Sequence, residues 1–441
     1  MTPQIKAETT AETLELELRT HRPAGWPDLP ESWILPRYDG LSVGNLAATS
    51  ARALGATLTA ALPPLRADLL GDLTAGVERV VLVVIDALGW LQLQRAMARY
   101  PDLVFHKLAE SGRLLPITTA FASTTTSVLN TIWSGQPPIR HGVLAYEMFL
   151  REWLMAVESI SFSTTHEPFG SRLLDWGFEP EKFVPTPTLG MQLAGQGLGS
   201  YALTFKDFVE TPLALMNYRG AREVYGYAHA SDFWVSLRRM LRERAGERCF
   251  IGAYWSAVDT LGHMYGPLDE TGEAEICSIA HLFETFFLDK LSASARERTL
   301  FLLTADHGQI TTSSEVGFLL DDHPELRDAL FLPPLGEARV PFFYVRHGAY
   351  DRVWAYLHEH FGEHFVFLSR AEVIERGLLG PDGGKMHTEA PHRLGDIVGI
   401  ARREAFLTRD PERLEKALRG QHGGLTAEEM MIPLLAARLD A

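Results

Sequence analysis

Two cysteines, Cys249 and Cys277, are all that the 441 residues offer for disulfide bonding. Cys249 begins an apolar run and Cys277 lies in a pattern of helical period, so both are expected to be buried thiols rather than partners in a disulfide. Small proteins of oxidising compartments usually depend on many more cysteines. The cysteine content therefore gives no support to an oxidising compartment.

Long apolar runs are also missing. No stretch approaches the ~20 apolar residues of a transmembrane helix. Residues 1–19 are acidic and polar, without the basic and apolar regions of a secretory signal. We therefore expect a soluble, cytoplasmic protein that does not bind membranes.

Positive charge is in deficit, with 41 Lys and Arg residues against 56 Asp and Glu residues and a formal net charge of -15. Such a charge argues against binding of nucleic-acid polymers and of anionic membranes. An anionic substrate would then have to be met by local positive charge, and bound metal ions are the obvious source.

What the sequence does contain is typical of a globular α/β protein. Hydrophobic residues make up 46% and charged residues 22%, close to globular averages. Residues 1–40 are polar and rich in proline, and we expect them to form an irregular lead-in. Buried strands alternate with segments of helical period, and three of these strands are predicted at Val80–Ile85, Cys249–Trp255 and Leu300–Thr304. This alternation predicts a mostly parallel central sheet flanked by helices.

Polar residues follow each of these three strands directly. The carboxyl ends of parallel strands meet at one edge of a sheet, where α/β proteins commonly place their sites. Asp259 and His263 are four residues apart, so a helix beginning there would present both on one face. Together with a later His-Gly-Gly segment, these strand ends supply six candidate metal ligands: Asp86, Asp259, His263, Asp306, His307 and His422.

Three carboxylates and three imidazoles suit zinc, with manganese or iron as alternatives. Six ligands are enough for two metals, which at a separation of about 4 Å can stabilise both the attacking and the leaving oxygen of a phosphoryl displacement. Each residue alone has a simpler interpretation, as a turn residue, a helix cap or a solvated pair. For all of these simpler interpretations to hold, four separate segments would have to imitate ligands independently.

Three consecutive threonines, Thr124 to Thr126, stand between a predicted strand and a predicted helix. One of them is expected to cap the helix, as threonine side chains often do. A neighbouring hydroxyl at the same helix N-terminus would lie where free N–H groups favour a bound anion. The two roles are compatible, because one threonine can cap while the next reacts.

These residues lie in segments that resemble the alkaline phosphatase superfamily, specifically its type I phosphodiesterase/nucleotide pyrophosphatase-like branch. The segments are VVLVVIDALGW, STTTSVLNTIWSGQPPIRHGV, YWSAVDTLGHMYGP, LLTADHGQ and HGGLTAEEMMIPLL, and they follow the family's order from about residue 80 to 434. The resemblance implies an alkaline-phosphatase-like core at 41–311 and 396–441, with a small inserted subdomain at 312–395.

The resemblance also implies how the ligands divide. One metal would be held by Asp86, Asp306, His307 and the nucleophile, and the other by Asp259, His263 and His422. The family pattern places the nucleophile ten residues before the glycine of the Ser-Gly turn, which gives Thr125, with Thr124 as the alternative. The implied reaction is in-line attack by Thr125, a phospho-threonine intermediate, and hydrolysis by water from the opposite side.

The sequence departs from the family at two places near this threonine. Thr126-Ser127-Val128-Leu129 replaces the Phe-Pro-Asn-His string of eukaryotic-type members, which puts a nucleotide pocket of the familiar kind in doubt. The arginine that follows the nucleophile in classical alkaline phosphatases is absent, which favours diesters over monoesters. The C/S-x-P-x-R signature of sulfatases is absent as well.

We therefore expect a metal-dependent hydrolase that cleaves phosphodiester or pyrophosphate bonds of small phosphorylated substrates. A phosphomonoesterase or phosphomutase of the same superfamily is the alternative, and an inactive metal-bearing binding protein is the alternative from another class. Specificity determinants are expected at 145–248 and 312–420, where Arg339 is interpreted as structural rather than substrate-binding. The sequence leaves the oligomeric state open.

Overall fold

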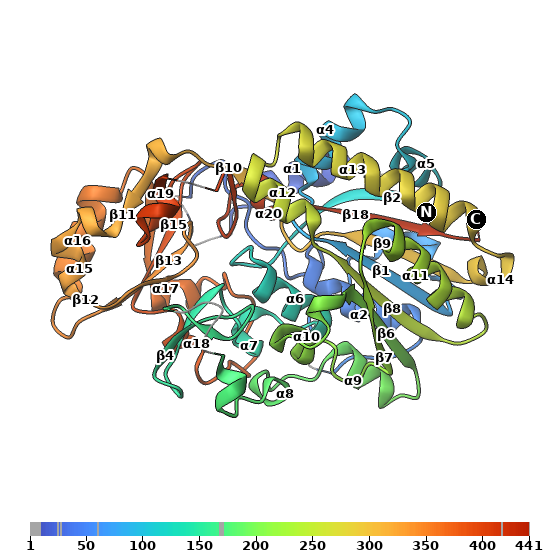
Figure 1. Cartoon of the computed structure of the whole chain (residues 1–441), viewed down its shortest axis with the longest axis horizontal. Coiled ribbons are helices and arrows are strands. Elements are labelled where there is room, and N and C mark those ends of the chain that lie inside the picture. The colour runs from blue at the N-terminus through green and yellow to red at the C-terminus, as the bar shows by residue number, and fades with distance from the viewer. Residues whose placement is uncertain are drawn as a thin grey trace, which may run out of the picture.

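The computed structural model describes residues 10–23, 26, 29–59, 61–166, 172–415 and 418–440. Within these residues, two seven-stranded sheets lie side by side along the long axis of the molecule (Figure 1). The central sheet has the spatial order β2 (Arg113–Thr118), β18 (Met431–Arg438), β9 (Thr299–Thr304), β1 (Arg79–Ile85), β8 (Cys249–Trp255), β6 (Gly199–Phe205) and β7 (Glu223–Tyr227).

The five strands β9, β1, β8, β6 and β7 are parallel to one another, whereas β18 runs antiparallel to both β9 and β2. Every residue of β1, β8 and β9 is buried, as continuous apolar runs predict for strands covered on both faces. The prediction of an α/β fold with a mostly parallel central sheet is confirmed.

Helices cover both faces of the central sheet (Figure 1). On one face, α11 (Ala230–Glu243) packs Phe233 against Trp255 of β8. On the other, Trp133 of α6 (Thr125–Ser134) packs against Phe250 of the same strand. The other helices around the sheet are α2 (Leu46–Ala53), α4 (Trp90–Arg99), α5 (Val104–Ser111), α9 (Leu189–Ala194), α10 (Pro212–Asn217), α12 (Ala257–Tyr265) and α13 (Glu270–Leu282).

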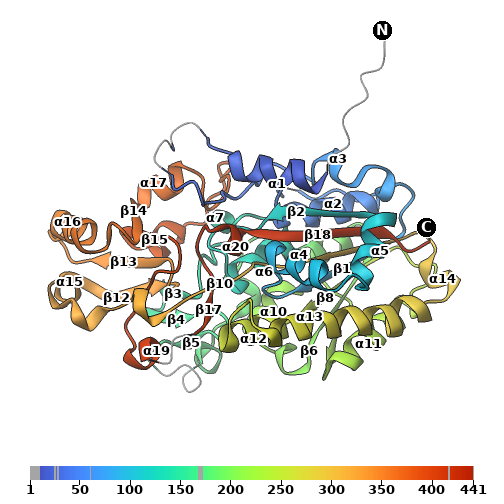
Figure 2. The same cartoon turned by 90° about the horizontal axis from the view of Figure 1, so that it is seen from above.

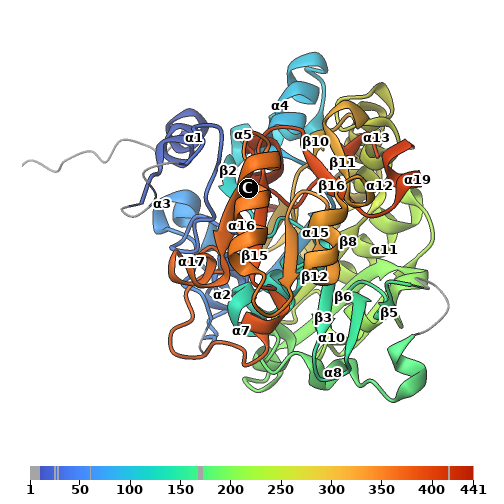
Figure 3. The ribbon, with the colours of Figure 1, turned by 90° about the vertical axis from the view of Figure 1, so that its left-hand side faces the viewer.

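All neighbouring strands of the second sheet are antiparallel, and the strands come from distant parts of the sequence. Its order is β14 (Phe365–Ser369), β15 (Ile397–Ala401), β13 (Pro341–Val345), β12 (Leu330–Gly336), β3 (Glu147–Leu150), β4 (Met155–Glu158) and β5 (Ser163–Thr164). Helices α15 (Pro324–Ala329) and α16 (Tyr350–Phe361) lie in front of it when it is seen from its end (Figure 3).

The membership of this sheet differs from the inserted subdomain expected at 312–395. Strand β15 follows residue 395, and β3 to β5 precede residue 312, so part of the sheet comes from ranges assigned to the core. An apolar strand pattern shows that a strand exists but does not show which sheet it joins. The division into a core and an insertion therefore stays a prediction.

The lead-in expected at 1–40 contains a helix, α1 (Ala11–Thr20), so its description as irregular is wrong for these residues. The Thr10 hydroxyl caps the helix, and Leu14 and Leu18, one turn apart, are both fully buried. Trp90 Nε1 donates a hydrogen bond of 2.8 Å to Glu15, which ties α1 to α4. Residues 1–9, 24, 25, 27 and 28 of the expected lead-in lie outside the described residues.

Two short strand pairs lie outside the two large sheets. The pair β10 (Ile310–Thr311) and β17 (Gly420–Gln421) is antiparallel, and the pair β11 (Gly317–Leu319) and β16 (Phe406–Thr408) is parallel. Figures 1 and 2 both place α12, β10 and α20 (Ala427–Met430) at the junction of the sheets. The other short helices are α3 (Ala67–Leu70), α7 (Pro138–His141), α8 (Pro180–Phe183), α14 (Ala293–Arg296), α17 (Arg370–Glu375), α18 (Ala390–Arg393) and α19 (Pro411–Glu415).

None of the helices in the described part of the chain is both long and apolar enough to cross a lipid bilayer.

Candidate active site

The structure brings the sequence-predicted site residues together at the carboxyl edge of the central sheet. Asp86 follows β1, Asp306 and His307 follow β9, and β8 leads into α12 with Asp259 and His263. His422 follows β17, and Thr125 is the first residue of α6. Because β9, β1 and β8 are parallel neighbours, their ends deliver these side chains to one place.

The first group of candidate ligands consists of Asp86, Asp306 and His307, and the backbone holds the carboxylate of Asp306 in place. Its Oδ1 accepts hydrogen bonds from the backbone N–H groups of Ala87 (3.1 Å) and His307 (2.9 Å). Its Oδ2 lies 3.8 Å from His307 Nε2, and Asp86 Oδ1 lies 3.4 Å from the same nitrogen. Asp306 and His307 are fully buried and Asp86 is 3% exposed. Three ligand atoms therefore face one small volume that solvent barely reaches.

The proton on His307 can be assigned from its neighbours. Its Nδ1 lies 3.1 Å from the carbonyl oxygen of Gly308, and because a carbonyl only accepts, Nδ1 must carry the hydrogen. In the neutral ring, Nε2 is then an acceptor, and it lies 3.1 Å from Thr125 Oγ1. The Thr125 hydroxyl therefore points at the same nitrogen as the two carboxylates, whereas Thr124 makes no such contact.

Thr124 occupies the N-cap position of α6, but its side chain makes no capping hydrogen bond. The expectation that one threonine caps this helix through its hydroxyl is therefore wrong for the N-cap residue. Thr126 turns away from the site, since its hydroxyl lies 3.4 Å from the Ala145 carbonyl oxygen and 2.8 Å from the Ser159 hydroxyl. Of the three threonines, Thr125 alone reaches the ligand group.

The second ligand group is built in the same way. His263 Nδ1 donates to the Gly420 carbonyl (2.7 Å) and His422 Nδ1 donates to the Ser123 carbonyl (3.0 Å), which leaves both Nε2 atoms free of protons in the neutral rings. These Nε2 atoms lie 3.3 and 3.8 Å from Asp259 Oδ1. Backbone carbonyls that fix the tautomer of a histidine are typical of metal-ligating sites.

The two groups adjoin each other. The rings of His307 and His422 stack with their centroids 4.0 Å apart. Ligand atoms of Asp259, His263 and His422 lie within 4.8 Å of one another, and so do ligand atoms of Asp86, Asp259 and His307. Asp259 thus lies within reach of both groups, and its assignment to one metal remains an expectation.

The charges and unpaired atoms fit a pair of divalent cations. Asp86 Oδ1 and Asp306 Oδ2 are buried and have no hydrogen-bond partner, although buried carboxylate oxygens normally have one. Burial, followed by repulsion from Asp306 and Asp259, raises the pKa of Asp86 well above its ordinary value. Burial and the neighbouring His307 and His263 rings lower the pKa of His422. A bound cation would relieve the repulsion and engage both orphan oxygens.

Two residues that hold the ligands in place were missed by the sequence reasoning. The Tyr254 hydroxyl donates to Asp86 Oδ2. Gln309 Nε2 donates to Asp259 Oδ1 (2.6 Å) and to its backbone carbonyl (3.2 Å). Both stand close to the candidate ligands in the sequence: Tyr254 is one residue before the end of β8, and Gln309 is two residues after His307. This closeness is the signal from which their roles could have been predicted.

A buried ion pair supports the loop that carries His422. Arg339 and Glu429 are both fully buried, and Arg339 Nε and Nη2 lie 2.6 and 3.0 Å from the Glu429 carboxylate oxygens. The same carboxylate accepts the N–H of Gly424 at 2.8 Å. The interpretation of Arg339 as structural agrees with this geometry.

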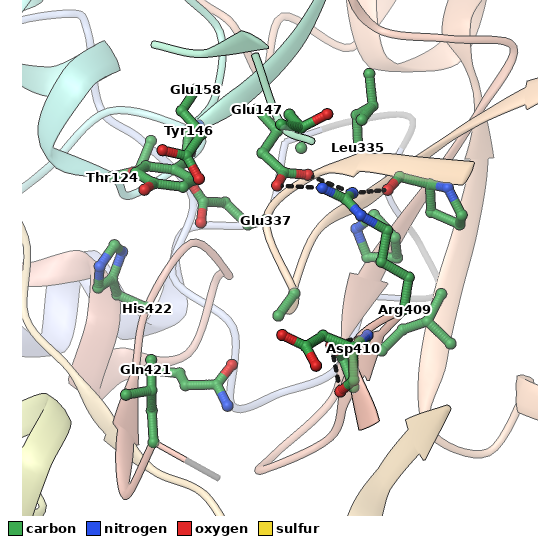
Figure 4. A pocket seen from close by; sticks show the side chains of 18 of the residues that line it. Thr124, Tyr146, Glu147, Glu158, Leu335, Glu337, Arg409, Asp410, Gln421 and His422 are labelled. Carbon is green, nitrogen blue, oxygen red and sulfur yellow. Dashed lines mark hydrogen bonds and ion pairs between the residues drawn. The ribbon is translucent and has the colours of Figure 1, made fainter. Parts of the chain in front are cut away.

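A cavity of about 630 Å³ opens onto the site between the two sheets (Figure 4). Thr124, Thr125, Asp259, His263 and His422 line it on the side of the central sheet. A cavity of this size accommodates a small organic ligand.

The sequence profile of the type I phosphodiesterase/nucleotide pyrophosphatase family matches residues 80–425, a range that contains all seven site residues. The chain belongs to this family. Comparison with curated proteins finds no match. The resemblance to the type I phosphodiesterase/nucleotide pyrophosphatase-like branch and the prediction of a hydrolytic enzyme are thereby confirmed.

Several solved structures have the same fold as this chain. Murine ectonucleotide pyrophosphatase/phosphodiesterase 5, in an inactive form in complex with AMP, aligns at a TM-score of 0.60 and 18% identity, covering 82% of this chain and 88% of that chain. The human protein of the same name aligns at 0.59 and 18% identity, covering 81% and 87%. Phosphonoacetate hydrolase from Sinorhizobium meliloti 1021, in complex with phosphonoformate, aligns at 0.60 and 18% identity, covering 81% and 89%.

Proposed function

We propose that this protein is a metal-dependent phosphodiesterase or pyrophosphatase that acts on small phosphorylated compounds, with Thr125 as its nucleophile. The observation that carries the proposal is the Thr125 hydroxyl, 3.1 Å from His307 Nε2, at the N-terminus of a ten-residue helix and beside two adjoining ligand groups. Membership of the family supports phosphoester hydrolysis.

The ligand groups suit two metals. Asp86, Asp306, His307 and Thr125 would hold one, and Asp259, His263 and His422 the other. When bound, such metals lower the pKa of a coordinated hydroxyl and neutralise charge on phosphoryl oxygens. The mixture of imidazole and carboxylate ligands favours zinc over harder cations, with manganese or iron as alternatives.

The chain's own residues position and orient the reacting groups. The N-terminus of α6 directs its unpaired backbone N–H groups towards the anionic phosphoryl group. The Thr125 hydroxyl gives up its proton to solvent, and a bond forms between Oγ1 and phosphorus. The bond from phosphorus to the leaving oxygen breaks, and that oxygen keeps the electron pair and takes a proton from solvent. Water then displaces Thr125 from phosphorus, which releases the phosphorylated product and restores the hydroxyl.

Two features favour a diester or pyrophosphate over a monoester. Thr126, the residue after the nucleophile, is buried against Ala145 and Ser159 and offers no positive charge to the phosphoryl group. Among the described residues that line the cavity, the only arginine is Arg409, and Glu147 binds it at 2.7 and 2.6 Å. A monoester carries more anionic oxygen and would gain more from such a cation.

The structural neighbours are compatible with this proposal. The murine protein is an inactive threonine-to-alanine variant in complex with AMP, and the bacterial protein is a phosphonoacetate hydrolase in complex with phosphonoformate. Both therefore bind small molecules that contain phosphorus. We further propose a cytoplasmic location, in keeping with the free thiols of Cys249 and Cys277.

The test compares Thr125→Ala with Thr124→Ala, its immediate neighbour, after both proteins are loaded with zinc. We expect Thr125→Ala to lose at least about a thousandfold in turnover of bis-p-nitrophenyl phosphate, and Thr124→Ala to stay within about tenfold of wild type. Metal content measured by mass spectrometry should remain near two equivalents per chain for both variants.

Loss of turnover in Thr124→Ala alone would move the nucleophile by one residue. A metal-loaded wild type that turns over neither bis-p-nitrophenyl phosphate nor p-nitrophenyl phosphate would contradict the enzyme proposal. Faster turnover of the monoester than of the diester would favour a phosphomonoesterase.

A further inference from the structure

Another cavity, of about 440 Å³, lies apart from the active site. It shares no lining residue with the active-site cavity. Gln136, which lines it, follows the C-terminal end of α6, whereas Thr125 begins that helix. Ten helical residues span about 15 Å. A ligand in this cavity, called the Gln136 cavity below, would therefore not touch the candidate metal ligands.

Helix α7 and the loop before α18 form one wall of the Gln136 cavity, and the two helices lie beside each other (Figure 1). The His387 N–H donates a hydrogen bond of 2.9 Å to the Ile139 carbonyl. Arg140 Nε donates to the Asp382 carbonyl at 2.8 Å. The loop that carries Lys385 is therefore fastened to α7 at two points.

The other wall is the segment Pro185-Thr186-Pro187. The two proline rings fix the backbone on either side of Thr186. Arg219 Nη2 also donates to the Thr186 carbonyl at 2.7 Å. The Thr186 hydroxyl oxygen is buried and has no hydrogen-bond partner among the described residues. This wall therefore holds an unsatisfied hydroxyl on a backbone that is already fixed.

Gln136 is 1% exposed, and its amide can be oriented from its neighbour. Arg140 Nη1 lies 3.3 Å from the atom assigned as Gln136 Oε1. A guanidinium only donates, so the atom that faces it must be the amide oxygen, and the other must be the nitrogen. That nitrogen is buried and has no hydrogen-bond partner in the described part of the chain. Two N–H donors at the cavity thus lack an acceptor, although buried polar groups normally have one.

His387 adds a third donor to the lining. Its Nδ1 accepts the Glu389 N–H at 3.1 Å, so the hydrogen of the neutral ring is on Nε2. Burial and the nearby Arg393 guanidinium lower the pKa of His387 to about 4. At neutral pH the ring therefore offers an N–H group rather than a charge.

The charge of the lining is positive in a protein whose formal net charge is -15. Lys385 is exposed at the rim, and its ammonium group forms no ion pair with any described residue. The Arg140 guanidinium is a second cationic group of the lining. No described residue that lines the cavity is acidic, and Glu389 beyond its edge pairs with Arg151 at 2.8 Å. The cavity therefore suits an anion.

We propose that the Gln136 cavity binds a phosphate group, either as inorganic phosphate or as the phosphoryl end of a small monoester. Its oxygens would accept from the Gln136 amide, the Thr186 hydroxyl and the His387 ring. The Lys385 ammonium would balance its charge. A phosphate dianion offers more acceptor oxygens than a carboxylate, which matches donors that come from three separate segments. The proposal does not depend on the reaction proposed for the active site.

The test is a calorimetric titration of inorganic phosphate into zinc-loaded wild type and zinc-loaded Gln136→Glu. The variant keeps an acceptor for Arg140 but replaces the unsatisfied amide nitrogen with a carboxylate oxygen. Its affinity at this cavity should fall by at least about tenfold, so wild type should bind one phosphate more per chain. Phosphate bound at the active site is common to both proteins and cancels. The same difference should persist after the zinc is chelated.

Gln94→Glu, at an exposed position of α4, is the matched control and should bind as much phosphate as wild type. Lys385→Ala gives an independent measure at an exposed site that folding does not require. It should weaken phosphate binding by about threefold at low salt and by less as salt is added. Lys290→Ala, another exposed lysine, should leave the affinity unchanged.

Titrations with methyl phosphate and with acetate identify the ligand more closely. Tighter binding of methyl phosphate than of inorganic phosphate would assign the cavity to a phosphorylated metabolite, and the reverse order would assign it to free phosphate. Acetate should bind at least about tenfold more weakly than either. Equal phosphate stoichiometry in wild type and Gln136→Glu, unchanged affinity in Lys385→Ala, or acetate binding as tight as that of phosphate would each overturn the proposal.

Discussion

At the scale of single residues, Asp306 follows strand β9 of the central sheet and places its carboxylate in the candidate metal site. One of its carboxylate oxygens is held by two backbone N–H groups, and the other is buried without a partner. We expect Asp306→Asn to lose metal and at least about a hundredfold of diesterase turnover. The amide places a neutral group, and in one orientation a donor, where a cation should bind.

Metal content and the far-ultraviolet circular dichroism spectrum check this prediction. The spectrum should stay unchanged, because the strand ladder of β9 does not involve the Asp306 side chain. Asp321→Asn, at an exposed position, serves as the control for the same chemical change. Wild-type metal content and rate in Asp306→Asn would show that this carboxylate is not a ligand.

The positions of the candidate ligands followed from the sequence because each stands at the end of a buried strand or in a short motif. Asp86 and Asp306 needed only the rule that parallel strands end at one edge. The supporting roles of Tyr254 and Gln309 could not be predicted, because they depend on which way side chains point across neighbouring strands and loops. The position of Asp259 within reach of both groups of candidate ligands could not be predicted either, because it depends on distances between atoms in the folded chain.

At the scale of elements, the contact between α6 and α7 has a buried histidine at its centre. His141 is fully buried, its Nδ1 accepts the Val143 N–H at 3.1 Å, and its Nε2 lies 3.0 Å from the Thr131 hydroxyl. Burial, with His387 and Arg393 nearby, lowers the pKa of His141 to about 3. The ring is therefore neutral in the folded protein at physiological pH.

This lowered pKa predicts acid destabilisation. Below the unfolded pKa of about 6.5 the unfolded chain binds a proton that the folded chain does not, so stability falls as pH decreases towards 3. For His141 alone the free energy of unfolding should drop by about 2 kcal/mol between pH 7 and pH 5. Urea unfolding of wild type and of His141→Gln at both pH values measures the difference, and an equal pH dependence in the two proteins would contradict the assignment.

The ion pair between Arg339 and Glu429 joins an arginine next to β13 to a glutamate in α20. Arg339→Met would leave the Glu429 carboxylate buried without its partner, and the free energy of unfolding should fall by about 3–5 kcal/mol. Zinc affinity at the His422 side should fall as well, since Glu429 also holds Gly424. Arg327→Met removes an exposed ion pair instead and should cost less than about 1 kcal/mol.

Chemical denaturation and zinc titration give the two readouts for Arg339→Met. Unchanged stability with normal zinc affinity would show that the pair has no role in holding the loop.

Helix α1 illustrates what sequence patterns missed at this scale. Its residues are mostly polar, and only the spacing of Leu14 and Leu18 marks the buried face.

At the scale of the whole molecule, metal binding should stabilise the fold without building it. The candidate ligands follow the ends of strands, and the ladders of the central sheet form from backbone groups elsewhere. Chelation should abolish turnover and lower the melting temperature, and zinc at about 1,000 times its Kd should restore about 4 kcal/mol. Calorimetry with and without chelator checks this, and an unchanged melting temperature with retained turnover would contradict metal dependence.

The sequence predicted the central sheet better than the second one. Continuous apolar runs mark β1, β8 and β9 without ambiguity, because strands buried on both faces need such runs. The second sheet pairs β12 with β3, and no local pattern in either strand identifies that distant partner. In the same way, no local pattern shows that β15 belongs to this sheet, and the boundary expected at residue 395 separates β15 from its neighbours β13 and β14.

The position of β18 has a consequence for how the protein is made. This strand lies between β2 and β9, yet it is translated long after both. At ~5–20 residues per second, the nascent chain exposes the unpaired edge of β2 for roughly tens of seconds before its neighbour leaves the ribosome. Open strand edges pair readily with other chains. Synthesis should therefore depend on chaperones during this interval, and a ribosome that stalls before Met431 would release a product prone to aggregation.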